Sequence, residues 1–438
     1  MSLPESSNLL TSPADLESLA SSTQILTSKP EELTAENVTT AAQIVDRLLR
    51  SPNATESVRV AAVATVSQLL SAPDDSEDNN ATLSLTETLD QLSVNLTLSL
   101  NTSQSQVVQP NLVVQSAQIP AADTQGVQFT SLSGTSGSFV ADRIELNTNT
   151  STVVVENGFI ADALIYVRFP PEAAGVRQKL SNVSLGFVLY QNDRFFRSRR
   201  YKRQRATIRV LSATVGGQER SVVPDHVEIM FRPRMVNGTS LYDFACVFWD
   251  YHVNDWSTDG CSKGNASDGL LRCFCNHTTN FAALWTFREK YEYAEALDWI
   301  SIVGLSLSIL CLLVTIVHQI FHISSDNQNV TIALLCICVS LLAFIITFVS
   351  GVQNSSRQND AQVEVDATTN TIPDSDQRVE PDRGSCSAVA ALLHFFLLAT
   401  FMWSSVYSTL MALVFVTKQK GLPSHWSKLS HAVGWGGL

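Results

Sequence analysis

The chain has 438 residues, of which 16% are charged and 45% are hydrophobic, and it carries a formal net charge of −12. This length allows two or three domains. The low charged fraction and a mean hydropathy of +0.09 exclude an ordinary soluble protein. Part of the chain must therefore lie in a membrane. The opening residues, MSLPESSNLL, have neither the basic start nor the apolar core of a secretory signal, so we expect the N-terminus to be incomplete.

The N-terminal region has the spacing of amphipathic helices between residues 13 and 72. The sequence SPNATES separates two apolar groups, which are Ala42, Ile44, Val45, Leu48 and Leu49, then Val58, Val60, Ala61, Ala64, Val66 and Leu69. We predict a helical subdomain over residues 1–100.

Short β-rich runs follow from about residue 105. They read NLVVQSAQI, STVVVENGF, ALIYVRF, VSLGFVLY, ATIRVLSATV and HVEIMF. These runs predict a β-sandwich over residues 101–287.

A basic cluster interrupts this acidic chain at Arg194, Arg197, Arg199, Arg200, Lys202, Arg203 and Arg205. A solvated hairpin loop is the favoured interpretation. The alternative is a convertase cleavage site at Arg200-Tyr201-Lys202-Arg203. Nucleic-acid binding is disfavoured, because this region is predicted to be extracellular.

The segment from residue 246 to 285 holds the most specific pattern, CVFWDYHVNDWSTDGC followed by CFCNHTTNFAALW. Its notable residues are Cys246, Trp249, Trp256, Gly260, Cys261, Cys273, Cys275, His277, Thr278 and Thr279. A disulfide-stapled β-module without chemistry is one interpretation, and four cysteines allow three connectivities.

The spacing of His277 and Thr279 favours chemistry instead. On a β-strand residues i and i+2 face the same side, so these side chains can meet with the Thr278–Thr279 peptide between them. An imidazole that accepts the hydroxyl proton is the usual way to activate a threonine. We expect no metal ion and no cofactor.

This pattern resembles the GPCR proteolysis site of adhesion G-protein-coupled receptors. The resemblance implies that Thr279 is the nucleophile and His277 the general base of a single N-to-O acyl shift in cis, which cuts the chain after Thr278. It also implies disulfides from Cys246 to Cys273 and from Cys261 to Cys275. Two features depart from the family: Thr278 stands where Leu is common, and Asn276-His277-Thr278 is a glycosylation sequon.

The residues after the expected cut resemble the tethered agonist of that family. They are Thr279, Asn280, Phe281, Ala282, Ala283, Leu284 and Trp285. As a helix, the segment puts Phe281, Leu284 and Trp285 on one apolar ridge. The alternative is a plain last strand and linker.

Three apolar runs are long enough to cross the roughly 30 Å hydrocarbon layer as helices, at residues 298–320, 330–352 and 386–416. Residues 353–385 are polar and acidic, which predicts a disordered outer loop. Residues 417–438 predict a cytoplasmic loop and the start of a fourth helix. Three of an expected seven helices are thus present.

Glycosylation sequons indicate which side is extracellular. They occur at Asn37, Asn53, Asn80, Asn95, Asn101, Asn149, Asn182, Asn237, Asn265, Asn276 and, between the second and third runs, Asn354. Asn329 also forms a sequon, but we expect it to stay unmodified at the cytoplasmic end of a helix. Lysines 418, 420 and 428 follow the third run, as expected of a cytoplasmic segment.

The sequence therefore predicts a multidomain membrane protein: a helical subdomain and a β-sandwich like the autoproteolysis-inducing GAIN domain, then transmembrane helices. The resemblance implies a multi-pass plasma-membrane receptor with an extracellular N-terminus. Its partners would be a heterotrimeric G protein and an extracellular or matrix ligand, and its two fragments would stay non-covalently associated. The alternatives are a polycystin-like membrane protein with the same cleavage motif, and a truncated adhesive or decoy receptor that does not signal.

Overall fold

The computed structural model describes residues 12–73, 80–100, 102–120, 125–134, 137–154, 160–169, 183–204, 206–216, 224, 226–265, 269–289, 294–321, 328–360, 369–377, 384–417 and 425–436. The chain forms two compact units. The first comprises residues 1–289 and 364–378, and the second residues 290–363 and 379–438.

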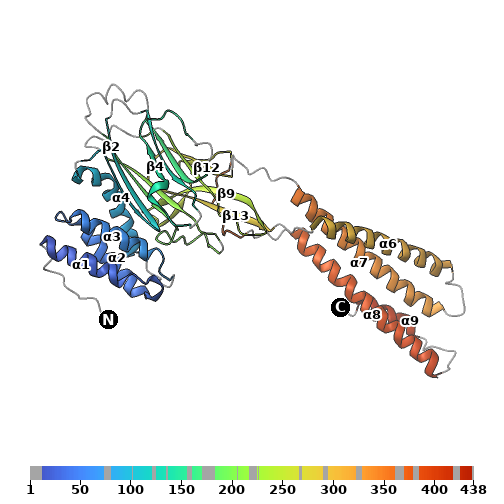
Figure 1. Ribbon diagram of the computed structural model, residues 1–438. Coiled ribbons are helices and arrows are strands. Elements are labelled where there is room, and N and C mark those ends of the chain that lie inside the picture. The colour runs from blue at the N-terminus through green and yellow to red at the C-terminus, as the bar shows by residue number, and fades with distance from the viewer. Residues whose placement is uncertain are drawn as a thin grey trace. The chain divides into compact units, whose positions relative to one another are not determined.

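Among the residues that the structure describes, four helices open the first unit, which confirms the predicted helical subdomain (Figure 1). They are α1 (Pro13–Leu26), α2 (Ala35–Arg50), α3 (Glu56–Leu69) and α4 (Asn80–Leu100). Ser12, Thr34 and Thr55 cap the first three helices, each accepting a hydrogen bond from a backbone N–H of the first turn. A short 3-10 turn, Pro30–Glu32, separates α1 from α2, and α4 lies beyond the apolar pattern that predicted the helices.

Two antiparallel sheets follow these helices among the described residues of the first unit. The seven-stranded sheet has the order β1 (Gln104–Gln109), β2 (Leu112–Ile119), β6 (Val183–Tyr190), β7 (Val210–Gly216), β13 (Asn280–Glu289), β9 (Thr239–Asp250) and β10 (Asp255–Ser257). The six-stranded sheet has the order β11 (Cys261–Lys263), β12 (Leu271–Cys275), β8 (His226–Phe231), β5 (Ala161–Arg168), β3 (Gly126–Leu132) and β4 (Ile144–Asn147), and a short 3-10 turn at Ala141–Arg143 precedes β4.

The sheets face each other across one apolar core, as the stacked rings of Phe129 on β3 and Phe187 on β6 illustrate, with centroids 5.4 Å apart. Helix α4 packs on β2, β6 and β7. Gly186 on β6 permits this close approach, because a Cβ there would lie 2.0 Å from Ser93 Oγ on α4.

The strand expected over residues 151–159 is wrong for the part that the structure describes, residues 151–154. The backbone of Val154 is paired with a side chain rather than with a strand. Gln128 Nε2 donates to the Val154 carbonyl, and the Val154 N–H donates to Gln128 Oε1. The neighbouring strand is β4 instead, which pairs with β3. Residues 155–159 lie outside the described part of the chain.

The prediction of a disordered outer loop over residues 353–385 is also wrong in part. Residues 369–377 are ordered and belong to the first unit, and helix α7 (Gln328–Asp360) runs beyond the predicted end of the second span. Asp376 is fully buried and Ile372 packs against the core of the sandwich, so these residues are a structural part of that unit.

The second unit is helical and consists of α6 (Ala294–Phe321), α7, α8 (Gly384–Thr417) and α9 (Trp426–Gly436). Within the part of the chain that the structure describes, three stretches are long and apolar enough to cross a membrane: Trp299–Phe321, Gln328–Gly351 and Ser387–Leu413. This agrees with the predicted membrane helices. Gly434 on α9 lies against Trp403 on α8, where a Cβ would meet the indole ring at 2.3 Å.

Candidate functional site

The His277–Thr279 segment lies where the chain passes from one sheet to the other. Strand β12 ends at Cys275 in the six-stranded sheet, and β13 begins at Asn280 in the seven-stranded sheet. The expectation that His277 and Thr279 share a strand is therefore wrong, because residues 276–279 lie between these two strands and belong to neither. The Thr278–Thr279 peptide belongs to a short linker held at both ends.

Gly260 shapes this linker. Its φ is +70°, and its carbonyl accepts the Asn276 N–H at 3.2 Å. A Cβ on Gly260 would lie 2.4 Å from Asn276 Oδ1 and 3.3 Å from His277 Nδ1. Glycine is thus required both by the backbone conformation and by the closeness of the turn.

His277 is held by two aromatic rings and one hydrogen bond. Its ring packs edge-on against Phe248 at 4.4 Å and tilted against Phe281 at 5.7 Å between centroids, and Nδ1 lies 3.0 Å from Asn276 Oδ1. Burial lowers the pKa of His277 below its ordinary value, which keeps the imidazole neutral near pH 7. With Nδ1–H donating to Asn276, Nε2 carries the free lone pair. Nε2 is buried and has no hydrogen-bond partner among the described residues.

Thr279 is anchored through its backbone, because its carbonyl accepts the Ala213 N–H at 3.1 Å. In the described part of the chain no hydrogen bond joins Thr279 to His277. The two residues share the linker without the contact that proton transfer needs. Catalytic hydrogen bonds are often long or absent in a resting geometry and form only as the reaction proceeds.

Two disulfides flank the linker, with the pairing that the resemblance implies. Cys246 on β9 joins Cys273 on β12 and so connects the two sheets. Cys261 on β11 joins Cys275 on β12, directly across a pair of neighbouring strands. Together they fix the last strand before the linker to both sheets.

Trp249 and Trp256 form the aromatic core beside this region. Both are almost completely buried, and their rings meet edge to face with centroids 5.1 Å apart. Phe196 packs against both. The two tryptophans are thus core residues of the sandwich.

Strand β13 contains the segment that resembles a tethered agonist. It is paired with β9 from Phe281 to Glu289 and with β7 only from Asn280 to Ala282. Phe281, Leu284 and Trp285 are each no more than 2% exposed. The segment is therefore inaccessible while it remains in the sandwich.

A buried polar network supports the first residue of β13, and sequence reasoning missed it. Asn280 Nδ2 donates to Asp90 Oδ2 at 3.0 Å and to the Tyr251 hydroxyl at 2.9 Å. Ser212 on β7 donates to the other oxygen of Asp90 at 2.6 Å. Asp90 lies on α4, so the helical subdomain reaches the residue that follows Thr279. No local pattern could reveal a contact between residues so far apart in sequence.

Three family models together match most of the chain. One described as GPR128, GAIN subdomain A, matches residues 6–95, one described as GAIN subdomain B matches residues 111–289, and the 7 transmembrane receptor (Secretin family) matches residues 294–437. Adhesion G-protein coupled receptor G7 of Homo sapiens is 34% identical over 442 residues, covering 97% of this chain and 53% of that protein. The chain belongs to the adhesion G-protein-coupled receptor family.

This adhesion receptor chain spans about half the length of the curated relatives it matches. The Mus musculus adhesion G-protein coupled receptor G7 is 32% identical over 430 residues, which are 97% of this chain and 53% of that protein. The full extracellular region of zebrafish Gpr126/Adgrg6 is 17% identical with a TM-score of 0.47, covering 61% of this chain and 35% of that chain. Family membership disfavours the polycystin-like alternative.

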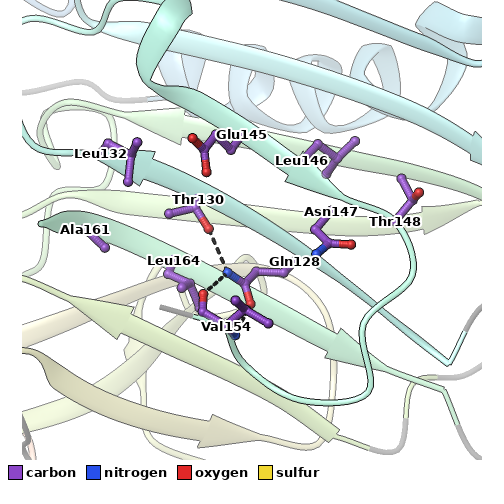
Figure 2. A pocket seen from close by; sticks show the side chains of 10 residues that line it. All are labelled: Gln128, Thr130, Leu132, Glu145, Leu146, Asn147, Thr148, Val154, Ala161 and Leu164. Carbon is purple, nitrogen blue, oxygen red and sulfur yellow. Dashed lines mark hydrogen bonds between the residues drawn. The ribbon is translucent and has the colours of Figure 1, made fainter. Parts of the chain in front are cut away.

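A separate hollow of the adhesion receptor lies on β3, β4 and β5, at the other end of the six-stranded sheet from β12 (Figure 2). Its central polar group, Gln128, donates to Thr130 Oγ and to the Val154 carbonyl at 3.0 and 2.6 Å. The polar groups of this side chain are thus already paired within the protein, and the hollow is remote from the His277 linker.

Proposed function

We propose that this chain cleaves itself once, between Thr278 and Thr279, and that the residues after the cut act as a tethered agonist. The observation that carries the proposal is the linker itself. It crosses between two disulfide-connected sheets and holds a neutral imidazole, with a buried nitrogen that lacks a partner among the described residues, two residues before a threonine.

The proposed chemistry is an N-to-O acyl shift. His277 Nε2 takes the hydroxyl proton as Thr279 Oγ attacks the carbonyl carbon of Thr278. The C–N bond then breaks, the proton passes to the leaving nitrogen, and an ester remains. Water hydrolyses that ester to give a carboxylate on Thr278 and a free α-amine on Thr279. The fixed ends of the linker favour this reaction because they restrict how far the peptide can relax away from the nucleophile.

After cleavage the two fragments would remain together through β13. All four motif cysteines precede Thr278, so neither disulfide links the fragments. Retention then rests on the ladder of β13 and on the burial of Phe281, Leu284 and Trp285. Release of the strand would present these side chains to the seven-helix domain of the complete receptor, at the plasma membrane, and activate a heterotrimeric G protein.

The test of cleavage is expression of the chain in a secretory host, followed by denaturing gels after deglycosylation. Wild type and Thr279→Ser should give two fragments, because both retain a hydroxyl nucleophile. Thr279→Ala and His277→Ala should give one band. Thr278→Ala is the matched control, since its side chain takes no part, and it should cleave. An intact wild-type chain would refute the chemical assignment.

The test of agonism uses a complete seven-helix receptor that begins at Thr279. Its basal G-protein activity should be high, and Phe281→Ala or Leu284→Ala should abolish that activity at equal surface expression. Removal of the ectodomain prevents a folding defect of the sandwich from being mistaken for lost agonism. Unchanged activity in both variants would mean that the segment is only a linker.

A further inference from the structure

Residues 369–377 cover the edges of β9 and β13 that no neighbouring strand pairs with in the described part of the chain. In sequence, these residues lie between the second and third membrane-crossing stretches. Strand β10 pairs with β9 only from Phe248 to Asp250, and β7 pairs with β13 only as far as Ala282. Beyond these points each strand has one edge without a neighbouring strand among the described residues. Such edges need partners for their backbone groups.

Asn370 covers the edge of β9 at Cys246. Its side-chain Oδ1 accepts the Cys246 N–H at 2.9 Å, and its Nδ2 donates to the Cys246 carbonyl at 2.9 Å. The same Nδ2 donates to the Cys261 carbonyl at 3.0 Å. The amide side chain thus takes the place of a neighbouring strand, and both cysteines that it contacts are disulfide-bonded.

Asp376 covers the edge of β13 at Phe287. Its backbone carbonyl accepts the Phe287 N–H of β13 at 3.0 Å. Its carboxylate, on a fully buried residue, accepts the N–H groups of Gln204 and Ala206 at 2.8 and 2.6 Å. Hydrogen bonds to a charged acceptor are among the stronger ones in proteins, and a buried carboxylate requires them.

The residues between these two anchors add further contacts. Ile372 packs against the core of the sandwich, and the Lys202 N–H donates to the Asp374 carbonyl at 3.0 Å. Parallel bridges join Lys202 to Ser375 and Phe287 to Gln377. Residues 369–377 therefore form a strap with an amide anchor at one end and a carboxylate anchor at the other.

Most of the strap's partners lie before the proposed cut, whereas the strap itself lies after it. We propose that residues 369–377 bind a docking surface on the N-terminal fragment, formed by Cys246, Cys261, Lys202, Gln204 and Ala206, and provide a second non-covalent tie between the fragments. The surface fits an extended peptide with an asparagine and, six residues later, an aspartate. The strap also bonds to Phe287, so release of the fragment requires both the strap and β13 to leave. This inference rests on the proposed cleavage.

The first measurement is the release of the N-terminal fragment from cleaved chain in detergent micelles, immobilised through its C-terminus. Asn370→Ala combined with Asp376→Asn should accelerate release by about ten- to a hundredfold, the effect of losing one or two hydrogen bonds to a buried charged or amide group. Asp142→Asn is the charge-matched control, because Asp142 is exposed and lies outside the strap, in the Ala141–Arg143 turn, and this variant should release at the wild-type rate. Equal rates in all three chains, or equal acceleration by the control, would overturn the proposal.

The second measurement does not depend on cleavage. In the Thr279→Ala chain, hydrogen exchange at the amides of Cys246, Ala206 and Phe287 should accelerate in the double variant, while amides of β2 and β6 remain protected. Replacement of residues 369–377 by a Gly-Ser linker of equal length should have the same effect. The synthetic peptide TNTIPDSDQ should then restore protection, and the peptide carrying both substitutions should not. Restoration by neither peptide, or by both equally, would show that the surface does not recognise this segment, even if cleavage is confirmed.

Discussion

Gly260 is the single residue on which the geometry of the linker depends most directly. Ala at this position would bring Cβ to 2.4 Å from Asn276 Oδ1 and would add the strain of a positive φ. We expect Gly260→Ala to displace Asn276 and with it the His277 ring, and so to reduce the cleaved fraction severely. The strain alone costs about 1–2 kcal/mol.

Gly238 provides the matched control, because its φ is +77° and a Cβ there would have no other atom within 4 Å among the described residues. Gly238→Ala should lower stability by a similar strain and leave cleavage unchanged. Densitometry of the two fragments at equal expression checks this difference. Equal cleavage in both alanine variants would mean that the close approach at Gly260 does not matter.

Asp90 predicts a dependence of ectodomain stability on pH. Burial raises the pKa of Asp90 from 3.8 to about 6, despite the hydrogen bonds from Ser212 and Asn280, and Glu87 adds to the rise. Tyr190 and Tyr251 also face this carboxyl group. The folded state therefore holds a proton that the unfolded state has lost, and stability falls as the pH rises from about 4 to about 6.

The variant that tests this is Asp90→Asn, which keeps an acceptor for Asn280 and gives Ser212 a donor. The rise in the pKa of Asp90 would give a larger gain for a fully buried group, but Asp90 is only half-buried as a residue, and solvent weakens the effect. We therefore expect the variant to be more stable than wild type by about 2 kcal/mol near pH 7, with no gain near pH 4. Urea unfolding at both pH values measures the difference. Glu87→Gln, at an exposed position of the same helix, should raise stability near pH 7 by a smaller amount, because the charge of Glu87 raises the pKa of Asp90 less than burial does. A gain that does not vary with pH would contradict the assignment to Asp90.

At the scale of elements, the two disulfides should differ in their effect. The Cys246–Cys273 bond closes 27 residues and connects the sheets, while the Cys261–Cys275 bond closes 14 residues between strands that are already paired. Each closure stabilises by about 3–4 kcal/mol in the chain-entropy account. We expect replacement of the first pair by alanine to lower the unfolding midpoint more and to abolish cleavage. A larger effect of the second pair would mean that the connection between the sheets is not what holds the linker.

Elements defined by local pattern were predictable, and elements defined by distant partners were not. Short β-rich runs predicted β2, β5, β6, β7 and β8, and the apolar runs predicted the membrane helices of α6, α7 and α8. Residues 151–154 have the same β-branched texture, yet their backbone pairs with the Gln128 side chain. The strap reads as a polar loop because its order comes from groups more than a hundred residues away.

In the candidate site, too, the residues within the motif were predictable from the sequence, and the residues from distant elements were not. The motif contains His277, Thr279, Gly260 and the four cysteines within one short stretch, so sequence spacing could find them. Asp90 and Asn370 contact the same region from α4 and from the strap. A carboxylate in a helix and an asparagine in a polar loop have no local signature, since the fold alone brings them there.

At the scale of the whole molecule, the sidedness of the membrane helices is testable in sealed microsomes. We expect externally added trypsin to cut after the lysines that follow the third span, 418, 420 and 428, and to leave the ectodomain intact. Detergent should make the ectodomain accessible and serves as the control. Digestion of the ectodomain in sealed vesicles would reverse the proposed orientation.

The unequal pairing of β13 also determines how the strand responds to a load. A pull on its Glu289 end meets rungs to β9 and the strap contact at Phe287, which can open one after another. Residues Asn280 to Ala282 come last, and they are bonded to β7, with Phe281 and Ala282 also bonded to β9. A force–extension trace should therefore show gradual peeling followed by a final abrupt rupture. The force at which the strand leaves the sandwich would then be set by its first three residues, next to the new N-terminus.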